Sequence, residues 1–578
     1  MVVPFYRLVK FNLFYFLSLS LYLYHINLSE YEGDDRLVKK SFKFFFNKFI
    51  RQHILTLIII LALGFSSLLF SFISPLLIKS LIDDVFVGRK VDLFGYIVIG
   101  IIGMYAVSSI SNYFKGFITG KLQLTLLKEV SGSIFGVIQF ASLESTQELK
   151  VGDLITRIMG NTQIAINVPV SIIPQFFMSV VGITVPFFIM MSLNFQLAII
   201  VMSPVILFVL VSSIFGKKMQ NIQKIFLENN ASVYSFLKES LSIISLIKVF
   251  GLESWSQNRF KGQIDDYFTT SISYTRMSSM NSSLSSLILG IPVVLLIIFG
   301  GYKVLEGTIS IGTFTAFISY TSIFFSPISQ LSSLWTSYKS ALPAFDRISE
   351  IFDMEMGKSG NKEIKIKYGN IKMEDVWFSY DNRRILKGFN AAFGKGLNYI
   401  VGDNGAGKST ILKLICSLYN VDKGTIEIDG QDITEIKRES LNRAISMIFA
   451  DPYLFDGSIY ENIRIGNLEA SQDDVIRVAK LVKIHNFIER TPEKYNTNVG
   501  EDGLLLSSGE KQKIALARAV LKDSPIILLD EVTKSVDADS REAINEVING
   551  LKNKKTVIII THNASEIDNE GNIVYLGT

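Results

Sequence analysis

The residues best suited to chemistry form a glycine-rich loop that begins at Gly402 and reads G-D-N-G-A-G-K-S. It fits the pattern G-x-x-x-x-G-K-[ST], in which glycines let backbone N–H groups turn toward phosphate oxygens. We expect Lys408 to reach the β- and γ-phosphates of ATP, and the hydroxyl of Ser409 to bind Mg²⁺. The nucleotide-binding residues predicted here are Gly402, Asn404, Gly405, Ala406, Gly407, Lys408, Ser409 and Thr410.

A pair of carboxylates follows an apolar run further along the chain. Ile526, Ile527, Leu528 and Leu529 read as a buried strand, and Asp530 and Glu531 come directly after it. Asp530 would hold Mg²⁺ directly or through water, and Glu531 could polarise the attacking water as general base. A buried strand that simply ends in two solvated acids is the alternative, which the phosphate-binding loop upstream makes less favourable.

The elements around the loop are those that a phosphate site needs. A strand-like run, Leu397 to Val401, precedes the loop, and a helix-like run, Thr410 to Leu418, follows it. The helix N-terminus would add its positive end to the phosphate site. Residues 366–578 have the composition of an α/β domain. The single cysteine, Cys416, excludes an intrachain disulfide framework, and with four histidines no structural metal cluster is expected.

The first half of the chain has a different composition. Apolar residues make up 49% of the 578 residues, charged residues 19%, and mean hydropathy is +0.35, which indicates an integral membrane protein. A helix needs about 20 mostly apolar residues to cross the hydrocarbon core. Such stretches lie at residues 54–78, 92–114, 165–190, 196–214, 283–302 and 313–335. The long connections after the second and fourth keep helical periodicity, so we expect them to extend the helices.

Lysine and arginine placement predicts the orientation. The two long connections hold most of these residues in the first half, and the short connections hold Arg89, Lys90 and Lys303. Positive residues favour the cytoplasmic side, so we expect the long connections and the C-terminal domain there, in a multi-pass protein of the plasma membrane. The formal net charge of +4 includes no basic block that suggests nucleic acid.

Two further segments precede the first span. Residues 42–50 carry phenylalanines at helical spacing with lysines between them, which predicts an amphipathic helix in the cytoplasmic interface of the lipid bilayer. An ordinary surface helix packed on protein is the alternative. Residues 11–28 are uncharged and apolar, and read as a seventh span, a signal-like segment or a second interfacial helix. We favour a membrane-embedded extension that is not part of the main membrane domain.

These ordered motifs identify a family resemblance that covers about residues 38–578. Residues 366–578 resemble the nucleotide-binding domain of ABC transporters, and the membrane half resembles the exporter type with fused domains (type IV). The resemblance implies an all-α six-helix transmembrane domain plus an α/β P-loop domain. The expected organisation is an N-terminal extension (1–37), a transmembrane domain (38–352), a linker (353–365) and a nucleotide-binding domain (366–578).

The resemblance assigns roles to further residues. Tyr380 matches the aromatic that stacks on adenine, and Asp537 lies in the loop that couples two sites. Ser507 and Gly509 match the signature residues that contact the γ-phosphate of ATP held by the opposite subunit. His562 matches the switch histidine that senses the γ-phosphate. The resemblance therefore implies Glu531 and His562 as catalytic residues and a second half-transporter as partner.

The chain departs from the family pattern at two places. Ala450 stands where the family has a glutamine that binds Mg²⁺, and the signature carries Ser508 and Glu510 where glycine and glutamine are usual. Either the chain is an active homodimer whose metal site is completed by water or Asp451, or it pairs with a related chain as a heterodimer. We predict that the chain's own ATP site hydrolyses ATP, because Lys408, Asp530, Glu531 and His562 all remain.

The predicted function is export of a cargo by alternating access, driven by ATP-bound closure of two such domains. Residues 277–302 and 308–338 carry no charge, which favours an apolar or amphipathic cargo such as a drug, a lipid or a hydrophobic peptide. The many serines there could instead serve helix packing. Two other classes stay open: an ATP-gated regulatory or channel-like subunit, and the structural half of a heterodimer.

Overall fold

The computed structural model describes residues 35–147, 149, 151–357, 359–380, 383–534, 536–561, 567–568 and 571–576. The chain divides into two compact units. Unit 1 comprises Met1–Phe135 and Val151–Phe352, and unit 2 comprises Gly136–Lys150 and Asp353–Thr578. The predicted extension over residues 11–28 and the predicted switch residue His562 lie outside the described residues.

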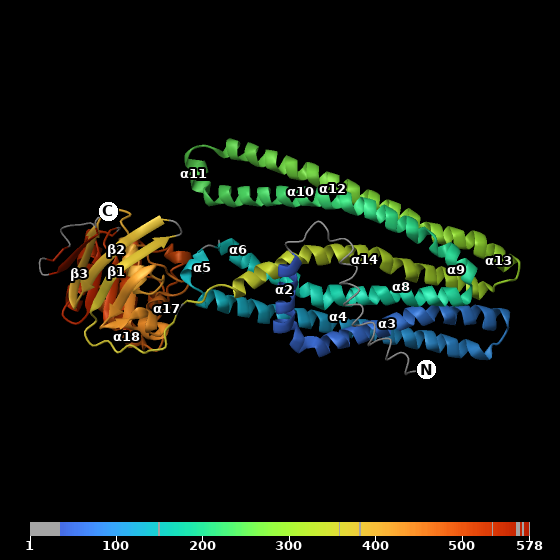
Figure 1. The fold of residues 1–578 in the computed structure, drawn as a ribbon, viewed down its shortest axis with the longest axis horizontal. Coiled ribbons are helices and arrows are strands. Elements are labelled where there is room, and N and C mark those ends of the chain that lie inside the picture. The colour runs from blue at the N-terminus through green and yellow to red at the C-terminus, as the bar shows by residue number, and fades with distance from the viewer. Residues whose placement is uncertain are drawn as a thin grey trace. The chain divides into compact units, whose positions relative to one another are not determined.

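Unit 1 is built from helices (Figure 1). The main ones are α2 (Asp35–Phe45), α3 (Ile54–Ser80), α4 (Asp92–Phe140), α8 (Ile173–Leu193), α9 (Phe195–Met202), α10 (Pro204–Ser242), α11 (Ile244–Val249), α12 (Glu253–Leu295), α13 (Gly301–Leu305) and α14 (Ile311–Phe352). Two short helices, α6 (Val151–Ile155) and α7 (Thr162–Asn167), precede α8. π-Helical turns join several of these, at Phe46–Ile50, Leu81–Val87, Thr156–Asn161, Val168–Ile172 and Leu296–Gly300.

Five helical stretches in the described part of the chain are long and apolar enough to cross a membrane. They are Lys40–Val87, Asp92–Phe140, Val151–Leu193, Glu253–Leu305 and Ile311–Phe352. The remaining expected span, residues 196–214, is divided, because α9 ends at Met202 and α10 begins at Pro204, whose missing N–H suits the first turn of a helix. Its apolar part, Phe195–Val211, is therefore shorter. The prediction of a helical transmembrane domain is confirmed.

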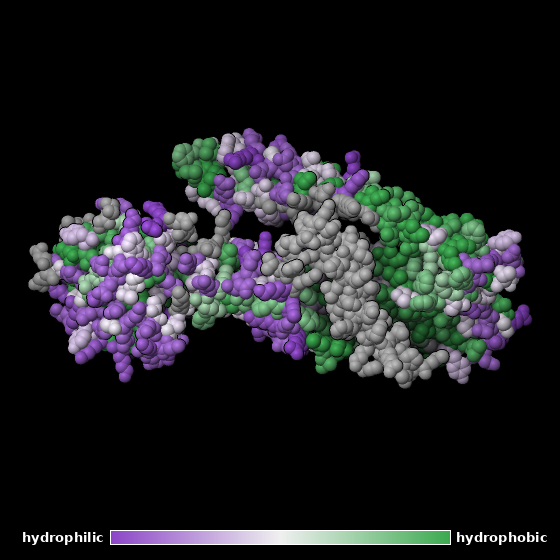
Figure 2. All heavy atoms as spheres, in the orientation of Figure 1, coloured by the Kyte–Doolittle hydropathy of each residue, from purple (hydrophilic) through white to green (hydrophobic). Residues whose placement is uncertain are grey.

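The two long connections are helical, as expected. α4 runs on to Phe140, α10 runs on to Ser242, and α12 begins at Glu253 and packs along α10. Figure 2 shows hydrophobic residues gathered on the part of this helix pair next to α9 and α13, and hydrophilic residues on the part toward α11. A helix that changes from apolar to polar along its length fits a span that continues into water.

The apolar face predicted for residues 42–50 packs on protein. Phe45 and Phe49 are buried, and their rings lie 5.2 Å from Phe345 and 5.9 Å from Phe352 near the end of α14. The ammonium of Lys48 lies 3.6 Å from the centre of the Phe352 ring, a cation–π contact. The phenylalanine face of this helix therefore packs on protein, which was the alternative to an interfacial helix. Contact of its lysines with lipid stays a prediction.

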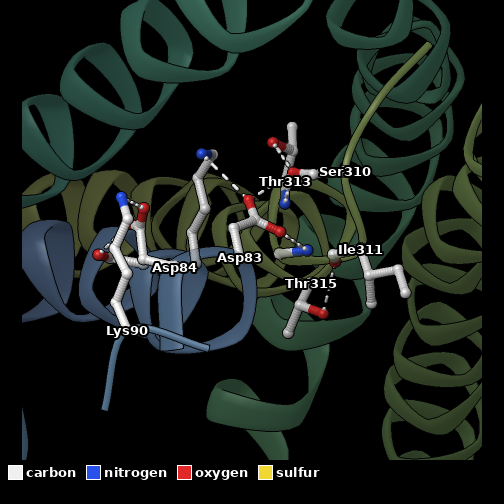
Figure 3. Close-up of polar contacts among 10 residues, drawn as sticks. Asp83, Asp84, Lys90, Ser310, Ile311, Thr313 and Thr315 are labelled. Carbon is white, nitrogen blue, oxygen red and sulfur yellow. Dashed lines mark hydrogen bonds and ion pairs between the residues drawn. The ribbon is translucent and has the colours of Figure 1, made fainter. Parts of the chain in front are cut away.

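The other end of α14 is capped by an aspartate from a different segment (Figure 3). Asp83, in the π-helical turn after α3, accepts a 2.9 Å hydrogen bond from the N–H of Gly312 and another from the hydroxyl of Ser310. The ammonium of Lys79 lies 3.2 Å from the same carboxylate. A Cβ at position 312 would lie 2.5 Å from the carbonyl oxygen of Lys79, so only glycine fits there. The cap ties the first turn of α14 to the end of α3.

Unit 2 contains two sheets. The antiparallel sheet has the order β2-β1-β4-β5, and the parallel sheet has the order β6-β7-β8-β3-β9. Their strands are β1 (Ile371–Tyr380), β2 (Arg383–Phe393), β3 (Gly396–Gly402), β4 (Lys423–Ile428), β5 (Gln431–Asp432), β6 (Ile445–Ile448), β7 (Ile526–Asp530), β8 (Thr556–Ile560) and β9 (Asn572–Leu576). The helices are α5 (Leu143–Gln147), α15 (Lys408–Ile415), α16 (Arg438–Ala444), α17 (Ile459–Arg464), α18 (Gln472–Leu481), α19 (His485–Arg490), α20 (Ser508–Lys522) and α21 (Ala538–Leu551).

The parallel sheet is covered on both faces, which explains its nearly continuous apolar strands. Ile527 and Leu529 of β7 face a core shared with α18, α20 and α21. Ile526 and Leu528 face the opposite core, which α15 and the antiparallel sheet complete. β3, β7 and β8 lie side by side and run in the same direction, so the residues that follow them meet at one edge. The predicted α/β domain is confirmed.

Candidate functional site

The glycine-rich loop connects β3 directly to α15. Gly405 and Gly407 have φ angles of 82° and 102°, values that favour glycine over residues with a side chain. Close packing adds a second constraint. A Cβ at Gly402 would lie 2.5 Å from the carbonyl oxygen of Leu576, and one at Gly407 would lie 2.5 Å from Cγ2 of Ile385. The glycines therefore let the loop turn sharply before the helix N-terminus.

Lys408, the first residue of α15, folds back over this loop. Its ammonium donates hydrogen bonds of 2.7 Å and 2.8 Å to the carbonyl oxygens of Gly402 and Asp403, and the residue is 5% exposed. Burial lowers the pKa of Lys408, because removing water disfavours the charged form. Phosphate oxygens at the loop would be strong partners for this ammonium.

Ser409 and Asp530 meet where α15 begins and β7 ends. The Ser409 hydroxyl donates a 3.0 Å hydrogen bond to Oδ1 of Asp530. Asp530 is 6% exposed, and burial raises its pKa. A buried carboxylate beside a hydroxyl offers the oxygen ligands that Mg²⁺ prefers, and a cation there would stabilise the charged carboxylate.

The described residues include no group of three or more histidine, cysteine, aspartate or glutamate side chains that could hold a metal.

Glu531 lies next to Asp530 in an uncommon backbone conformation. Its φ angle is 48°, and its N–H donates a 3.1 Å hydrogen bond to the carbonyl oxygen of Ile560 in β8. The ammonium of Lys534 lies 2.6 Å from Oε2 of Glu531. Lys534 was not among the residues predicted from the sequence, although a cation three residues after a candidate general base is a usable signal. The backbone hydrogen bond therefore ties the residue after β7 to the end of β8.

Tyr380 ends β1 and is held by other rings. Its ring centre lies 4.8 Å from Phe378 and 5.2 Å from Tyr419, both with nearly perpendicular ring planes. Tyr419 follows α15, so Tyr380 packs beside the helix that begins with the phosphate-binding residues. The stacking of this ring on adenine stays a prediction.

The signature residues form a second cluster with Asp537. Ser507 caps α20, since its N–H donates a 2.8 Å hydrogen bond to the carboxylate of Glu510 while its hydroxyl accepts from the Glu510 N–H. The unusual glutamate thus completes a capping box. A Cβ at Gly509 would lie 2.9 Å from the carboxylate of Asp537, so these two positions are in close contact.

The polar atoms of Ala450 all belong to the backbone, because its side chain is a methyl group. The carbonyl oxygen of Ala450 accepts a 2.6 Å hydrogen bond from the buried amide of Gln512 in α20. The end of β6 is thereby tied to the helix that starts at the signature. No side-chain ligand for a metal comes from Ala450, and Asp451 beside it is exposed.

Comparisons with known proteins agree with this geometry. The family model described as ABC transporter transmembrane region matches residues 57–328, and the model described as ABC transporter matches residues 387–534. ABC transporter B family member 1 of Dictyostelium discoideum is 29% identical over 524 residues, which are 89% of this chain and 57% of that protein. This chain thus spans little more than half of that relative.

Bacterial relatives match over more of their length. An ATP-dependent lipid A-core flippase of Syntrophus aciditrophicus is 27% identical over 86% of this chain and 84% of its own. The solved structure of a bacterial Atm1-family ABC exporter with ATP bound has a TM-score of 0.77, with 24% identity, over 92% of this chain and 94% of that one. The fold is therefore shared over nearly the whole chain.

Proposed function

Because this chain belongs to the ABC transporter superfamily, with an exporter-type transmembrane region and ATP-binding domain in one polypeptide, we propose that it is one half of a dimeric, ATP-hydrolysing exporter. The observation that carries this proposal is the 3.0 Å contact between Ser409 and Asp530, with Glu531 as the next residue. A phosphate-binding loop, a metal-binding pair and a general base are the parts that ATP hydrolysis requires.

Each of these residues has a defined role in the proposed reaction. Backbone N–H groups of the loop and the Lys408 ammonium bind the phosphates and orient them. Ser409 and Asp530 would hold Mg²⁺, which neutralises charge on the phosphates when bound. Glu531 accepts a proton from the attacking water. His562 is assigned to sense the γ-phosphate, on the family resemblance alone.

The working unit would contain two such chains. Ser507 and Gly509 of a second chain would close on the ATP held by the first, and Asp537 would link the two sites. ATP binds the closed arrangement better than the open one, so binding and hydrolysis shift the membrane helices between two states. The partner is a second copy or a related chain, and the absence of a side-chain ligand at Ala450 supports the heterodimer as an alternative.

The cargo is a hydrophobic or amphipathic molecule: a drug, a lipid or a peptide. The uncharged stretches at residues 277–302 and 308–338 support this class. The relatives carry compatible names, among them the lipid A-core flippase and a putative multidrug export protein of Bacillus subtilis, YgaD. Lysine and arginine placement supports an orientation with the ATP-binding domain in the cytoplasm, and the proposed location is the plasma membrane.

Reconstitution tests this proposal directly. The purified chain in inverted vesicles should hydrolyse ATP and accumulate a cargo against its gradient, and the matched variant Glu531→Gln should bind ATP without hydrolysing it. ATP hydrolysis without uphill accumulation for any stimulating cargo would indicate the gated, channel-like alternative. Absence of hydrolysis, both alone and with a co-expressed related half-transporter, would overturn the proposal.

A further inference from the structure

Unit 1 contains a cavity of about 720 Å³ between four helical segments. Its walls come from residues 60–71 of α3, 115–119 of α4, 170–182 in and before α8, and 322–330 of α14. Pockets that bind small molecules usually measure about 300–1,000 Å³, so this cavity has room for one drug-sized molecule. Every one of these segments belongs to the same compact unit.

The lining combines apolar side chains with one cation. Ile60, Leu68, Met178 and Ile323 give it an apolar wall. Lys115 is the one charged side chain among the lining residues that the structure describes. None of those lining residues is an aspartate or glutamate, and no described carboxylate forms an ion pair with Lys115. Lys115 directly follows the predicted second span, so its ammonium gives this cavity a single positive charge near the end of that span.

Neutral polar groups line the same cavity. Gln175 of α8 lies against Gln330 of α14, with 3.5 Å between the amide nitrogen and the amide oxygen. Ser71, Thr119, Ser322 and Ser326 add hydroxyls. Amides and hydroxyls can donate hydrogen bonds to an anionic oxygen without adding charge. The cavity therefore offers one positive charge, several neutral donors and an apolar wall.

We propose that this cavity binds a single-chain amphiphile with an anionic head group, carboxylate or phosphate, whose head lies at Lys115 and whose chain packs on the apolar wall. The proposal rests on the proposed export function and names its substrate class. It also narrows the expectation drawn from the sequence, where the uncharged residues 277–302 and 308–338 favoured an apolar or amphipathic cargo. Lys115 comes from α4, just beyond the predicted second span, and reaches the cavity only in the folded chain.

Binding to the full-length chain in neutral detergent, without nucleotide, tests the proposal. The probes are dodecyl phosphate, dodecanoate and dodecyltrimethylammonium, which share a chain and differ in head group. Native mass spectrometry gives their affinities for the wild type, Lys115→Gln, Lys115→Arg and Lys121→Gln. Lys121 is the matched control, since it lies on the same helix but does not line the cavity. The two anions distinguish a phosphate from a carboxylate head group.

We expect the wild type to bind at least one anion about tenfold or more tightly than the cation. Lys115→Gln should lower the affinity for that anion by about 10- to 100-fold, the range for losing one charge-assisted contact. Lys115→Arg and Lys121→Gln should leave this affinity unchanged. The comparison of the three head groups is made on the wild type, so it stays valid even if a variant fails to fold. Equal binding of anions and cation, or unchanged anion binding in Lys115→Gln, would overturn the proposal. Because no ATP is present, failure of ATP hydrolysis would leave this result unaffected.

Discussion

The hydroxyl of Ser409 donates a 3.0 Å hydrogen bond to the carboxylate of Asp530, although 121 residues separate them in sequence. Ser409 lies in the first turn of α15, and Asp530 is the last residue of β7. The contact exists because β3 and β7 both pair with β8 in the same direction, which brings the ends of these strands together. This pair is the best-defined part of the candidate ATP site.

Ser409→Ala removes one of the two oxygen ligands proposed for Mg²⁺. We expect the apparent affinity for Mg²⁺ to fall by about 10- to 100-fold, the range for losing one contact with a charged group. A Mg²⁺ titration of ATPase activity measures this change. Ser458→Ala is the control, because Ser458 caps α17 in the same unit and lies in no predicted site. The same Mg²⁺ dependence in both variants would argue against the assigned ligand.

Ala450→Gln restores an amide at the position where the family has a metal ligand. The backbone there is already held by Gln512, so the new side chain can extend without breaking that hydrogen bond. We expect a faster hydrolysis rate, by up to about tenfold, which corresponds to one interaction gained in the transition state. Ala450→Leu is the control, because leucine is close to glutamine in size but has no amide, and we expect it not to increase the hydrolysis rate. An unchanged rate in Ala450→Gln would mean that water or Asp451 already supplies the ligand.

Arg157 joins three groups within unit 1. Its guanidinium is buried, lies 2.7 Å from the carboxylate of Asp153 and 2.6 Å from that of Glu350, and donates a 3.0 Å hydrogen bond to the carbonyl oxygen of Arg347. Arg157→Ala should destabilise the fold, by an amount in the range of about 1–3 kcal/mol. We expect a value near the lower end of this range, because the Glu350 carboxylate is mostly exposed and its ion pair is weakened by water. Thermal denaturation in detergent measures the effect.

Arg347→Ala is the matched control for Arg157, since the Arg347 side chain is exposed and contributes only its backbone carbonyl to the contact. A similar fall in melting temperature for both variants would contradict the assigned role of Arg157.

Gly312→Ala should disturb the cap that Asp83 forms on α14. The added methyl group would lie 2.5 Å from the backbone carbonyl of Lys79, which cannot move without shifting α3. We expect a loss of stability of about 1–3 kcal/mol, as for other overpacking substitutions. Gly301→Ala provides the comparison, because a Cβ there meets nothing within 4 Å. A melting temperature that is lowered equally by both would exclude the close approach as the cause.

Cys416 should be unreactive in the folded protein. Burial raises the pKa of its thiol to about 12, so almost no thiolate, the reactive form, exists at pH 8. The unfolded chain has an ordinary thiol pKa of about 8.5 and should react with N-ethylmaleimide at that pH. Mass spectrometry before and after denaturation in sodium dodecyl sulfate counts the label. Rapid labelling of the folded protein would show that the thiol is accessible.

The same pKa shift has a predictable sign for stability. The folded state keeps the Cys416 proton above the pH at which the unfolded state loses it, so the unfolded state binds fewer protons there. The contribution of this neutral thiol to stability is complete below about pH 8.5 and is lost progressively as the pH rises toward 12.

The sequence alone was enough to recognise the family and the fold class and to predict a candidate ATP site. The Gly402 loop could be recognised because its residues are contiguous, and phosphate binding needs glycine, lysine and serine at fixed local spacing. The strands beside it were recognisable because a strand buried on both faces requires a continuous apolar run. Helical membrane segments were recognisable because lipid requires long apolar stretches. These requirements act along the chain, so they leave a readable pattern.

The tertiary structure decided which distant residues meet. The phenylalanines before the first span pack on Phe345 and Phe352, Asp83 caps α14, and the amide of Gln512 binds the carbonyl of Ala450. Lys115 enters a cavity whose other walls come from three further helical segments. No local spacing encodes these contacts, because each depends on how separate helices and strands pack. An amphipathic pattern shows that a face is apolar, and only packing determines what covers it.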